Sequence, residues 1–415
     1  MEFPNTGNSE LIAHVNRTLV MQAVRSLQPT FRAEVSRWTN LNPATVTGIV
    51  TDLLKTQLLK EVPGEARSGP AGGRPPMMLE LNNEARRILA IDLEPDVLRV
   101  ALVGLGINLL EYREEFLDRR GQPETVVDKI VELSRKVMEQ GRQKRIDGVG
   151  LSLPGLIDRE QGILIGSTNM PQWHNVPIRD LLTERLGLEP KLERSFHLAA
   201  MHEDWIDRSN QTTTKLVISL RTGIGASFVR RGELYLGAGG FDGEVGHTLI
   251  DLNGALCECG NRGCLETFVR ADAVCERVEK LIRSGRAREI ASAVAKGESL
   301  RPELVYRLAK QGDADAAEVV RDVGRYVGLA AANLVNLLAP DALILCGSID
   351  TADELILEAV REQIMERSLP QLRNHLTIRL AAAKEKSALL GAAVLVAREL
   401  FDLPRLSHPQ AASGA

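Results

Sequence analysis

The chain has 415 residues, 44% of them hydrophobic and 26% charged, which is typical of a globular protein with more than one domain. No apolar run reaches the ~18 residues of a membrane-spanning helix, and the first residues lack a secretory signal, so we expect a cytoplasmic protein that binds no membrane. The net charge of −4 gives no overall sign of nucleic-acid binding, although residues 17–74 hold eight basic and four acidic side chains.

Two helices are predicted at the N-terminus. Ser9 can cap the first, whose apolar side chains recur at spacings of three and four residues: Ile12, Val15, Leu19, Ala23 and Leu27. Pro29 ends this helix, and Thr30 is placed to cap a second one that runs to about Trp38. A tight connection then leads to a third helix.

The third helix has a strong start signal. Asn42 is a good N-cap, and Pro43 lacks only an N–H that would be unpaired at that position. Its side chains divide into an inward and an outward set: Val46, Ile49, Leu53 and Leu54 point inward, while Thr45, Thr47 and Thr51 point outward. Two short helices, a turn and a longer amphipathic helix form the helix-turn-helix pattern, whose second helix enters the major groove.

Two predicted strands, 58–62 and 77–81, flank a glycine- and proline-rich segment that carries Arg67 and Arg74. This is the pattern of a wing, a loop that presents arginines to phosphates or to the minor groove. We therefore expect a winged helix-turn-helix in residues 1–82. Its candidate DNA contacts are Asn42, Thr45 and Thr47 at base edges and Arg32, Arg67 and Arg74 at phosphates or the minor groove. The alternative is a small dimerisation or docking module with a solvated loop.

From residue 87 onward, strand-like and helix-like runs alternate. The predicted strands are 88–93, 97–105, 148–153, 216–220 and 343–346, and the predicted helices are 124–139, 316–338, 353–366 and 387–400. Early hairpin strands followed by strand–helix alternation, with a second such set, indicate two α/β lobes around a cleft. We expect a first lobe in residues 87–200, completed by a C-terminal helix in 386–402, and a second in 201–385.

Three of the five cysteines lie within eight residues, in the segment from Cys257 through Cys259 to Cys264, and His247 precedes them. Three thiolates and one imidazole are the number and type of ligands that a structural zinc site needs. Gly260 and Gly263 allow the loop to fold tightly around one ion. The alternative is three small buried side chains and a satisfied histidine. Because no ligand position is left for water, a zinc ion here would be structural.

These motifs resemble the ROK family, which comprises repressors, open reading frames and sugar kinases. The resemblance rests on the GEVGH and CxCGNRGCLE blocks, on 151–155, 169–173 and 222–225, and on an N-terminal block similar to the family's repressor branch. It implies an actin-like, ribonuclease H-like α/β body of two lobes, with zinc beside a sugar pocket. It also implies that Glu244, His247 and Glu266, and less closely Asn169, contact sugar hydroxyls.

The chain departs from the family's kinases at three places. The phosphate loop reads Asp92-Leu-Glu94-Pro95-Asp96 in place of Asp-x-Gly-Gly-Thr, so side chains and negative charge stand where glycine N–H groups would hold phosphate. Ser195 stands where kinases carry the aspartate that acts as general base, and only one glycine remains in the late Gly-Gly turn, at Gly347. We expect ATP to be repelled and no residue to be catalytic.

Arg194, which replaces an asparagine of the kinases, leaves two interpretations open. It either recognises an acidic ligand, such as a sugar phosphate or a uronate, or it pairs with Glu244 or Glu266 in the empty pocket.

Three hypotheses of function remain from the sequence. The first is a transcriptional repressor, a homodimer or a dimer of dimers, which binds a double-stranded DNA operator and responds to a sugar or sugar-phosphate effector. The second is a sugar kinase with unusual catalytic residues, which sugar phosphorylation by the pure protein would reveal. The third is a regulator that senses a partner protein in place of a sugar.

Overall fold

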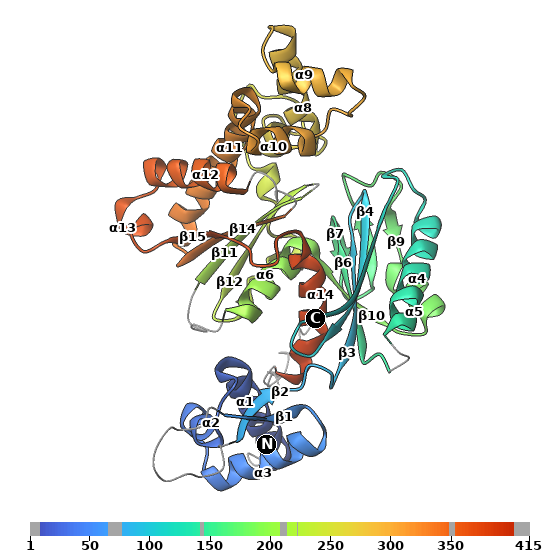
Figure 1. Ribbon diagram of the computed structural model, residues 1–415, viewed down its shortest axis with the longest axis vertical. Helices are drawn as coiled ribbons and strands as arrows, with labels where there is room; N and C mark the ends of the chain where they lie inside the picture. Colours follow the sequence, from blue (N-terminus) through green and yellow to red (C-terminus); the bar gives the residue numbers. More distant parts are fainter. Residues whose placement is uncertain are drawn as a thin grey trace, which may run out of the picture.

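The computed structural model describes residues 9–64, 77–141, 145–207, 214–221, 223–347 and 353–401. It shows a small N-terminal head at one end of the molecule, two α/β lobes, and a group of helices beyond the second lobe (Figure 1). Within these ranges no helix combines the length and the apolar character that crossing a membrane requires.

The head consists of three helices and a hairpin. Its elements are α1 (Ser9–Leu27), α2 (Arg32–Thr39), α3 (Pro43–Lys55) and the antiparallel strands β1 (Leu59–Pro63) and β2 (Met77–Leu81). The Oδ1 atom of Asn42 accepts a hydrogen bond from the Ala44 N–H at 2.8 Å, which confirms the predicted cap. Val46, Val50 and Leu53 are buried, whereas the predicted inward residues Ile49 and Leu54 are only half-buried.

The predicted cap of α2 was wrong by one residue. The helix begins at Arg32, with Phe31 as N-cap, because the backbone of Thr30 pairs with Leu79 of β2 in both directions, at 3.1 and 2.7 Å. The Thr30 hydroxyl donates to the Glu34 carboxylate at 2.7 Å, and the same carboxylate accepts from the Phe31 N–H at 3.2 Å. A tertiary backbone pairing therefore takes Thr30 out of the helix.

Each lobe is built on a five-stranded sheet, and the two sheets repeat one topology. The first has the order β10-β6-β3-β4-β5 and the second the order β13-β12-β11-β14-β15. In each, three antiparallel strands are extended by two strands parallel to the first. The first sheet comprises β3 (Arg87–Leu93), β4 (Val97–Gly104), β5 (Leu109–Phe116), β6 (Gly148–Leu153) and β10 (Pro190–Arg194); the second comprises β11 (Thr214–Leu220), β12 (Ile224–Arg230), β13 (Glu233–Leu234), β14 (Ala342–Gly347) and β15 (Thr377–Leu380).

Helices cover both faces of the first sheet. On one face lie α4 (Pro123–Gln140) and α5 (Ile178–Leu186), and on the other α14 (Ser387–Ala397), which packs on β3, β6 and β10. Between α14 and the second sheet lies α6 (Ser195–Ile206), near the centre of Figure 1. A small antiparallel sheet joins β7 (Leu156–Asp158), β8 (Ile163–Gly166) and β9 (His174–Val176).

The second sheet is covered by α11 (Ala314–Leu338) and α12 (Asp353–Arg367). The remaining elements are α7 (Glu266–Val269), α8 (Ala271–Arg283), α9 (Arg288–Ala295), α10 (Pro302–Lys310), α13 (Pro370–Arg373) and the short 3₁₀ helices η1 (Ala238–Gly240), η2 (Val245–His247), η3 (Lys384–Lys386) and η4 (Arg398–Leu400). The strands and helices predicted for the body agree with these bounds to within a few residues. The other strands of the two sheets and the helices α5, α6, α8, α9 and α10 were not predicted. The domain boundaries drawn from the sequence stay a prediction.

The head and the first lobe share one apolar core. Val20, Met21 and Val24 of α1 belong to the same buried cluster as Leu198 of α6 and Leu389 of α14. The head therefore packs directly against the body.

Candidate functional site

A cavity of about 540 Å³ lies between the two lobes. Its lining includes residues at the carboxyl ends of the parallel strands, which is where open α/β sheets form their ligand sites. The five residues predicted to contact a ligand all line it: Asn169, Arg194, Glu244, His247 and Glu266. The fold thus brings these side chains together, and their contact with a ligand stays a prediction.

Arg194 ends β10 and is followed at once by α6, so the strand-to-helix junction holds it in the cavity wall. Its side chain is 3% exposed and forms an ion pair with Glu244. It also donates to the backbone oxygen of Asp242 at 2.8 Å, and its guanidinium lies 4.3 Å from the centre of the Phe196 ring. Of the two interpretations that the sequence left open, the structure shows the ion pair. The charge of Arg194 is therefore compensated within the protein.

A buried network stands behind Arg194. Glu193 accepts two hydrogen bonds from Arg159, at 2.7 and 2.6 Å, and lies 2.9 Å from Nδ1 of His197. The Nε2 atom of His197 lies 3.0 Å from Asp242, so the ring is held between two carboxylates. Burial alone would raise the pKa of Glu193, but its hydrogen bonds with His197 and Arg159 outweigh burial and lower the pKa to about 2.

Four charged side chains meet between the lobes, at the rim of the same cavity. They are Asp92, Glu94, Arg99 and Arg221, and all are at most 9% exposed. Arg221 bonds both carboxylate oxygens of Asp92, at 3.1 and 2.5 Å, and forms an ion pair with Glu94. Arg99 forms an ion pair with Glu94 and lies 3.5 Å from Asp92. Because Asp92 is in β3 and Arg221 follows β11, the cluster ties one lobe to the other.

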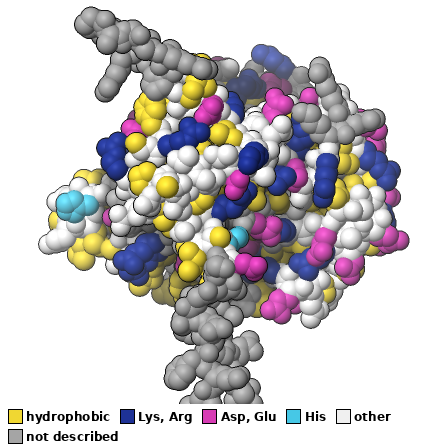
Figure 2. All heavy atoms as spheres, turned by 90° about the horizontal axis from the view of Figure 1, so that it is seen from below, with side chains coloured by type: hydrophobic (Ala, Val, Ile, Leu, Met, Phe, Trp, Pro, Cys, Tyr) yellow, Lys and Arg dark blue, Asp and Glu magenta, His cyan; other side chains and the backbone are white. Residues whose placement is uncertain are grey.

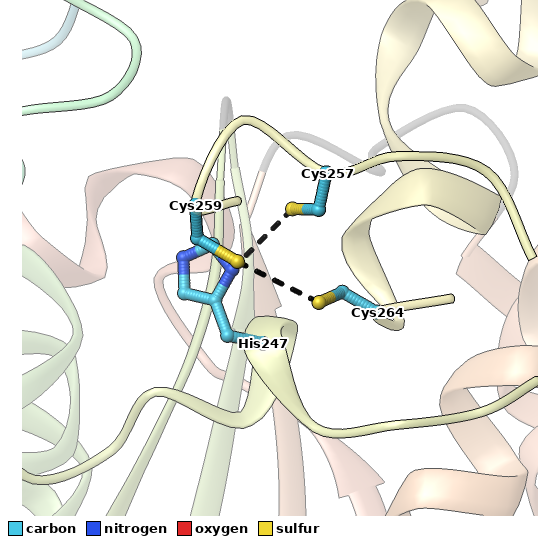
Figure 3. Close-up of side chains that lie close together, drawn as sticks. All are labelled: His247, Cys257, Cys259 and Cys264. Carbon is cyan, nitrogen blue, oxygen red and sulfur yellow. Dashed lines mark hydrogen bonds between the residues drawn. The ribbon is translucent and has the colours of Figure 1, made fainter. Parts of the chain in front are cut away.

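The predicted metal ligands come together as one group. His247 of η2 and three cysteines of the following loop, Cys257, Cys259 and Cys264, turn toward one another (Figure 3). One ligand atom from each lies within 4.8 Å of all the others. The Sγ atoms of Cys259 and Cys264 are 3.7 Å apart, and Sγ of Cys257 lies 3.6 Å from Nδ1 of His247.

These separations fit a tetrahedral ion. Ligands at the usual Zn–S and Zn–N distances would stand about 3.8 Å apart for two sulfurs and about 3.6 Å apart for sulfur and nitrogen. The loop folds this tightly because Gly260 and Gly263 have φ angles of 90° and 65°. At Gly263 a Cβ atom would lie only 1.6 Å from the backbone oxygen of Asp251. The cluster is therefore a candidate metal site that is compatible with structural zinc.

The head presents a surface of small polar residues along α3. Thr45 and Thr47 are exposed, and the Thr47 hydroxyl donates back to the Pro43 oxygen at 2.8 Å. Arg32 is half-buried in a 2.8 Å ion pair with Glu61 of β1. Arg67 and Arg74 lie outside the described residues. Figure 2 looks onto this end of the molecule and shows basic side chains scattered among acidic ones.

Comparison with known proteins identifies the family. Residues 88–399 match the model of the ROK family. The chain belongs to the ROK family. It is 29% identical over 400 residues to a xylose repressor of Caldicellulosiruptor bescii, covering 96% of this chain and 99% of the relative. It is 26% identical over 404 residues to the DNA-binding transcriptional dual regulator NagC of Escherichia coli, covering 97% of each.

Solved structures of the family support the fold. A crystal structure of a ROK family transcriptional regulator, described as a homologue of the E. coli MLC protein, superposes with a TM-score of 0.75 at 26% identity. The match covers 94% of this chain and 97% of that one. A ROK glucokinase of Streptomyces griseus, in complex with glucose and AMPPNP, shares the fold with a TM-score of 0.67 at 23% identity, but covers only 74% of this chain. The fold is therefore the two-lobed, actin-like one.

The structure does not support charge repulsion as the reason why residues 92–96 would fail to bind phosphate. From the sequence, the negative charges of Glu94 and Asp96 were expected to repel phosphate. In the structure Glu94 pairs with Arg99 and Arg221, and Asp96 pairs with Arg119 at 2.8 Å. The carboxylates are thus compensated, and the guanidinium of Arg221 lies at this loop. Sequence reasoning missed Arg221, although an arginine directly after a buried strand was a signal for it.

Proposed function

We propose that the chain is a transcriptional repressor whose affinity for DNA is controlled by a sugar. The observation that carries the proposal is the extent of the similarity. The repressor relatives match 96–97% of this chain, head included, whereas the glucokinase match covers 74%. The head has the helix order of a helix-turn-helix and an exposed face on α3.

In this proposal α3 is the helix that enters the major groove. Thr45 and Thr47 read base edges, and the Asn42 amide can do so while its oxygen caps the helix. Arg32, Arg67 and Arg74 contact phosphates or the minor groove. Two heads of a homodimer would bind inverted half-sites about 34–36 Å apart.

The effector is a neutral sugar that binds in the cavity between the lobes. Glu244, Glu266 and Asn169 supply hydrogen-bond partners for hydroxyl groups, as carboxylates and amides do in polar pockets. Arg194 and Arg221 also line the cavity, but each is held in ion pairs with the protein's own carboxylates. An acidic sugar would have to displace these carboxylates, so a neutral one is favoured over a sugar phosphate or a uronate.

We further propose that His247, Cys257, Cys259 and Cys264 hold a structural zinc ion. When bound, zinc would fix the loop and the imidazole, since four protein ligands leave no position for water. The Nε2 atom of His247 lies 3.8 Å from Glu244 on the cavity side. The ion would in this way hold one wall of the sugar pocket.

The proposal includes the absence of kinase activity. Ser195 stands at the start of α6 in the cavity wall and has no basic form near neutral pH. The loop at Glu94 and Pro95 lacks the glycine N–H groups that bind phosphate, and Arg221 is bonded into it.

The test uses the full chain and lets the protein select its own binding sequence. A duplex is selected from a random DNA pool, and its affinity is measured with D-xylose, N-acetylglucosamine, glucose or glucose 6-phosphate present. We expect one duplex to be enriched and one neutral sugar to weaken its binding about tenfold or more. Thr45→Ala should weaken duplex binding, while Ser292→Ala in α9 serves as control. Enrichment of no duplex, or phosphorylation of a sugar by ATP above background, would overturn the proposal.

A further inference from the structure

One helix reaches from the cavity to the head. Ser195 and Phe196, the first residues of α6, line the cavity, and Arg194 directly precedes them. The helix has 12 residues and is therefore about 18 Å long. Trp205, at its other end, belongs to the same apolar core as α1 of the head. In Figure 1, α6 lies between the two lobes and α14 runs from there toward α1.

The contact between Trp205 and the head is specific. The guanidinium of Arg25, in α1, lies 4.3 Å from the centre of the Trp205 ring. The Phe401 ring meets the same indole edge-on, with centres 5.0 Å apart at an interplanar angle of 90°. The backbone oxygen of Phe401 accepts a hydrogen bond from Gln22 of α1 at 2.5 Å. A cation over an indole face is directional, so a displaced Trp205 pulls on α1.

α6 is also tied to the second lobe by charged groups. The carboxylate of Glu203, which is fully buried, accepts from Arg379 of β15 at 2.7 Å and from the Ala382 N–H at 2.9 Å. Lys215 of β11 pairs with Asp204 at 2.8 Å and with Asp207 at 3.1 Å. These contacts tie α6 to the second sheet.

The opposite side of α6 lies against α14, which packs on the first sheet. The approach is so close that a Cβ atom at Gly391 would lie 1.9 Å from the backbone oxygen of Leu198. If the angle between the lobes changes and α6 follows the second sheet, α6 would slide along α14, in the way that packed helices shear. Such a shift carries Trp205 with it.

We propose that α6 transmits the state of the cavity to the DNA-binding head, with the contact between Trp205 and Arg25 as the coupling point. The inference rests on the proposed function, because it describes how the state of the same effector cavity reaches the DNA-binding helix α3. At one end of the route the Arg194–Glu244 ion pair and Phe196 respond to the ligand. At the other end, Val24 of α1 lies in the same buried cluster as Val50 and Leu53 of α3.

A double-mutant cycle tests this coupling without any effector. Arg194→Ala breaks the ion pair at the cavity end, and Arg25→Met removes the cation from Trp205 at the head end. We expect Arg194→Ala to change the affinity for the selected duplex about threefold or more in the wild-type background, and to have no effect beside Arg25→Met. Arg113→Met, an exposed arginine of β5, is the matched control and must leave the effect of Arg194→Ala intact.

Each outcome of this double-mutant cycle either supports or overturns the proposed coupling. If Arg194→Ala leaves the affinity unchanged, or acts equally in both backgrounds, the coupling through α6 is overturned while the proposed function stands. Arg25→Gln also removes the cation and keeps a flat polar end, and it replaces Arg25→Met if the methionine variant does not fold. If no duplex is selected, the proposed function fails, and the emission of Trp205 in a Trp38→Phe, Trp173→Phe background decides the inference alone. Arg194→Ala must then alter that emission, and unaltered emission overturns the coupling.

Discussion

Replacing Arg221 by methionine should destabilise the protein strongly. The substitution keeps the apolar stem but takes this partner from Asp92, which is fully buried, and from Glu94, which is 5% exposed, while their contacts with Arg99 stay. Breaking a buried ion pair by removing one partner costs about 3–5 kcal/mol, and because Arg99 still reaches both carboxylates we expect about 3 kcal/mol. For a body of roughly 300 residues, whose unfolding entropy is about 2 cal/mol/K per residue, that lowers the melting temperature by about 5 °C, which scanning calorimetry measures.

The stability that Arg221→Met loses relative to the wild type should be smaller at low pH than at high pH. In the wild type, burial alone would raise the pKa of Asp92, but the charges of Arg221 and Arg99 outweigh burial and lower the pKa. That stabilisation is present above the unfolded value of about 3.9 and is lost as the pH falls through the lowered folded value. In Arg221→Met burial of Asp92 is less well offset, so the Asp92 carboxylate takes up a proton more readily, and the variant loses less stability at pH 5 than at pH 8.

Two comparisons make the result decisive. Arg119→Met removes an ion pair with Asp96 whose side chains are 50% and 43% exposed, so it should cost only about 0–1 kcal/mol. Adding Asp92→Asn to Arg221→Met removes the uncompensated charge and should recover part of the lost stability. A melting temperature like that of Arg119→Met, or a deficit that stays constant from pH 5 to pH 8, would refute the reasoning.

Three further predictions follow from the structure. Cys264→Ser should remove zinc from the purified chain and lower its melting temperature, because metal-binding energy is folding energy, whereas Cys275→Ser, outside the cluster, should keep the metal as judged by elemental analysis. Asn42→Ala should lower the free energy of unfolding by about 1 kcal/mol through loss of the α3 cap, in contrast to the exposed Thr45→Ala; equal effects in urea titrations would argue against the cap. Burial lowers the pKa of His197, but its two carboxylates outweigh burial and raise it. Its stabilisation is complete below the unfolded value of about 6.5 and is lost as the pH rises through the raised folded value, so His197→Asn should flatten the alkaline decline in stability.

The sequence predicted the features that depend on local pattern. Hydrophobic periodicity located β3, β4 and β6 of the first sheet, β11 and β14 of the second, and the helices of the head, because buried faces repeat with the period of their own element. The spacing of Cys257, Cys259 and Cys264 predicted a cluster that the structure shows together with His247. The Asn42-Pro43 pair marked the start of α3 correctly.

Features that depend on partners distant in the sequence were missed. The Arg221 side chain meets Asp92 across 129 positions, and the pair of carboxylates around His197 comes from two separate segments. An arginine inside the apolar strand β4, Arg99, was a signal that a buried anion must be near, but the anion could not be named from the sequence. Thr30 was misjudged because its backbone pairs with β2, which no local propensity reveals.

The shared apolar core of the head and the first lobe limits which segments can be exchanged to transfer DNA specificity between related proteins. Because Val20 and Met21 of α1 are buried together with side chains of α14, a transplanted head would meet a surface shaped for another sequence. Swapping α3 alone leaves that contact intact, whereas swapping the whole head requires the C-terminal helix and Phe401 to travel with it. A chimeric regulator of this family should therefore take both its N-terminal head and its C-terminal helix from the same parent protein.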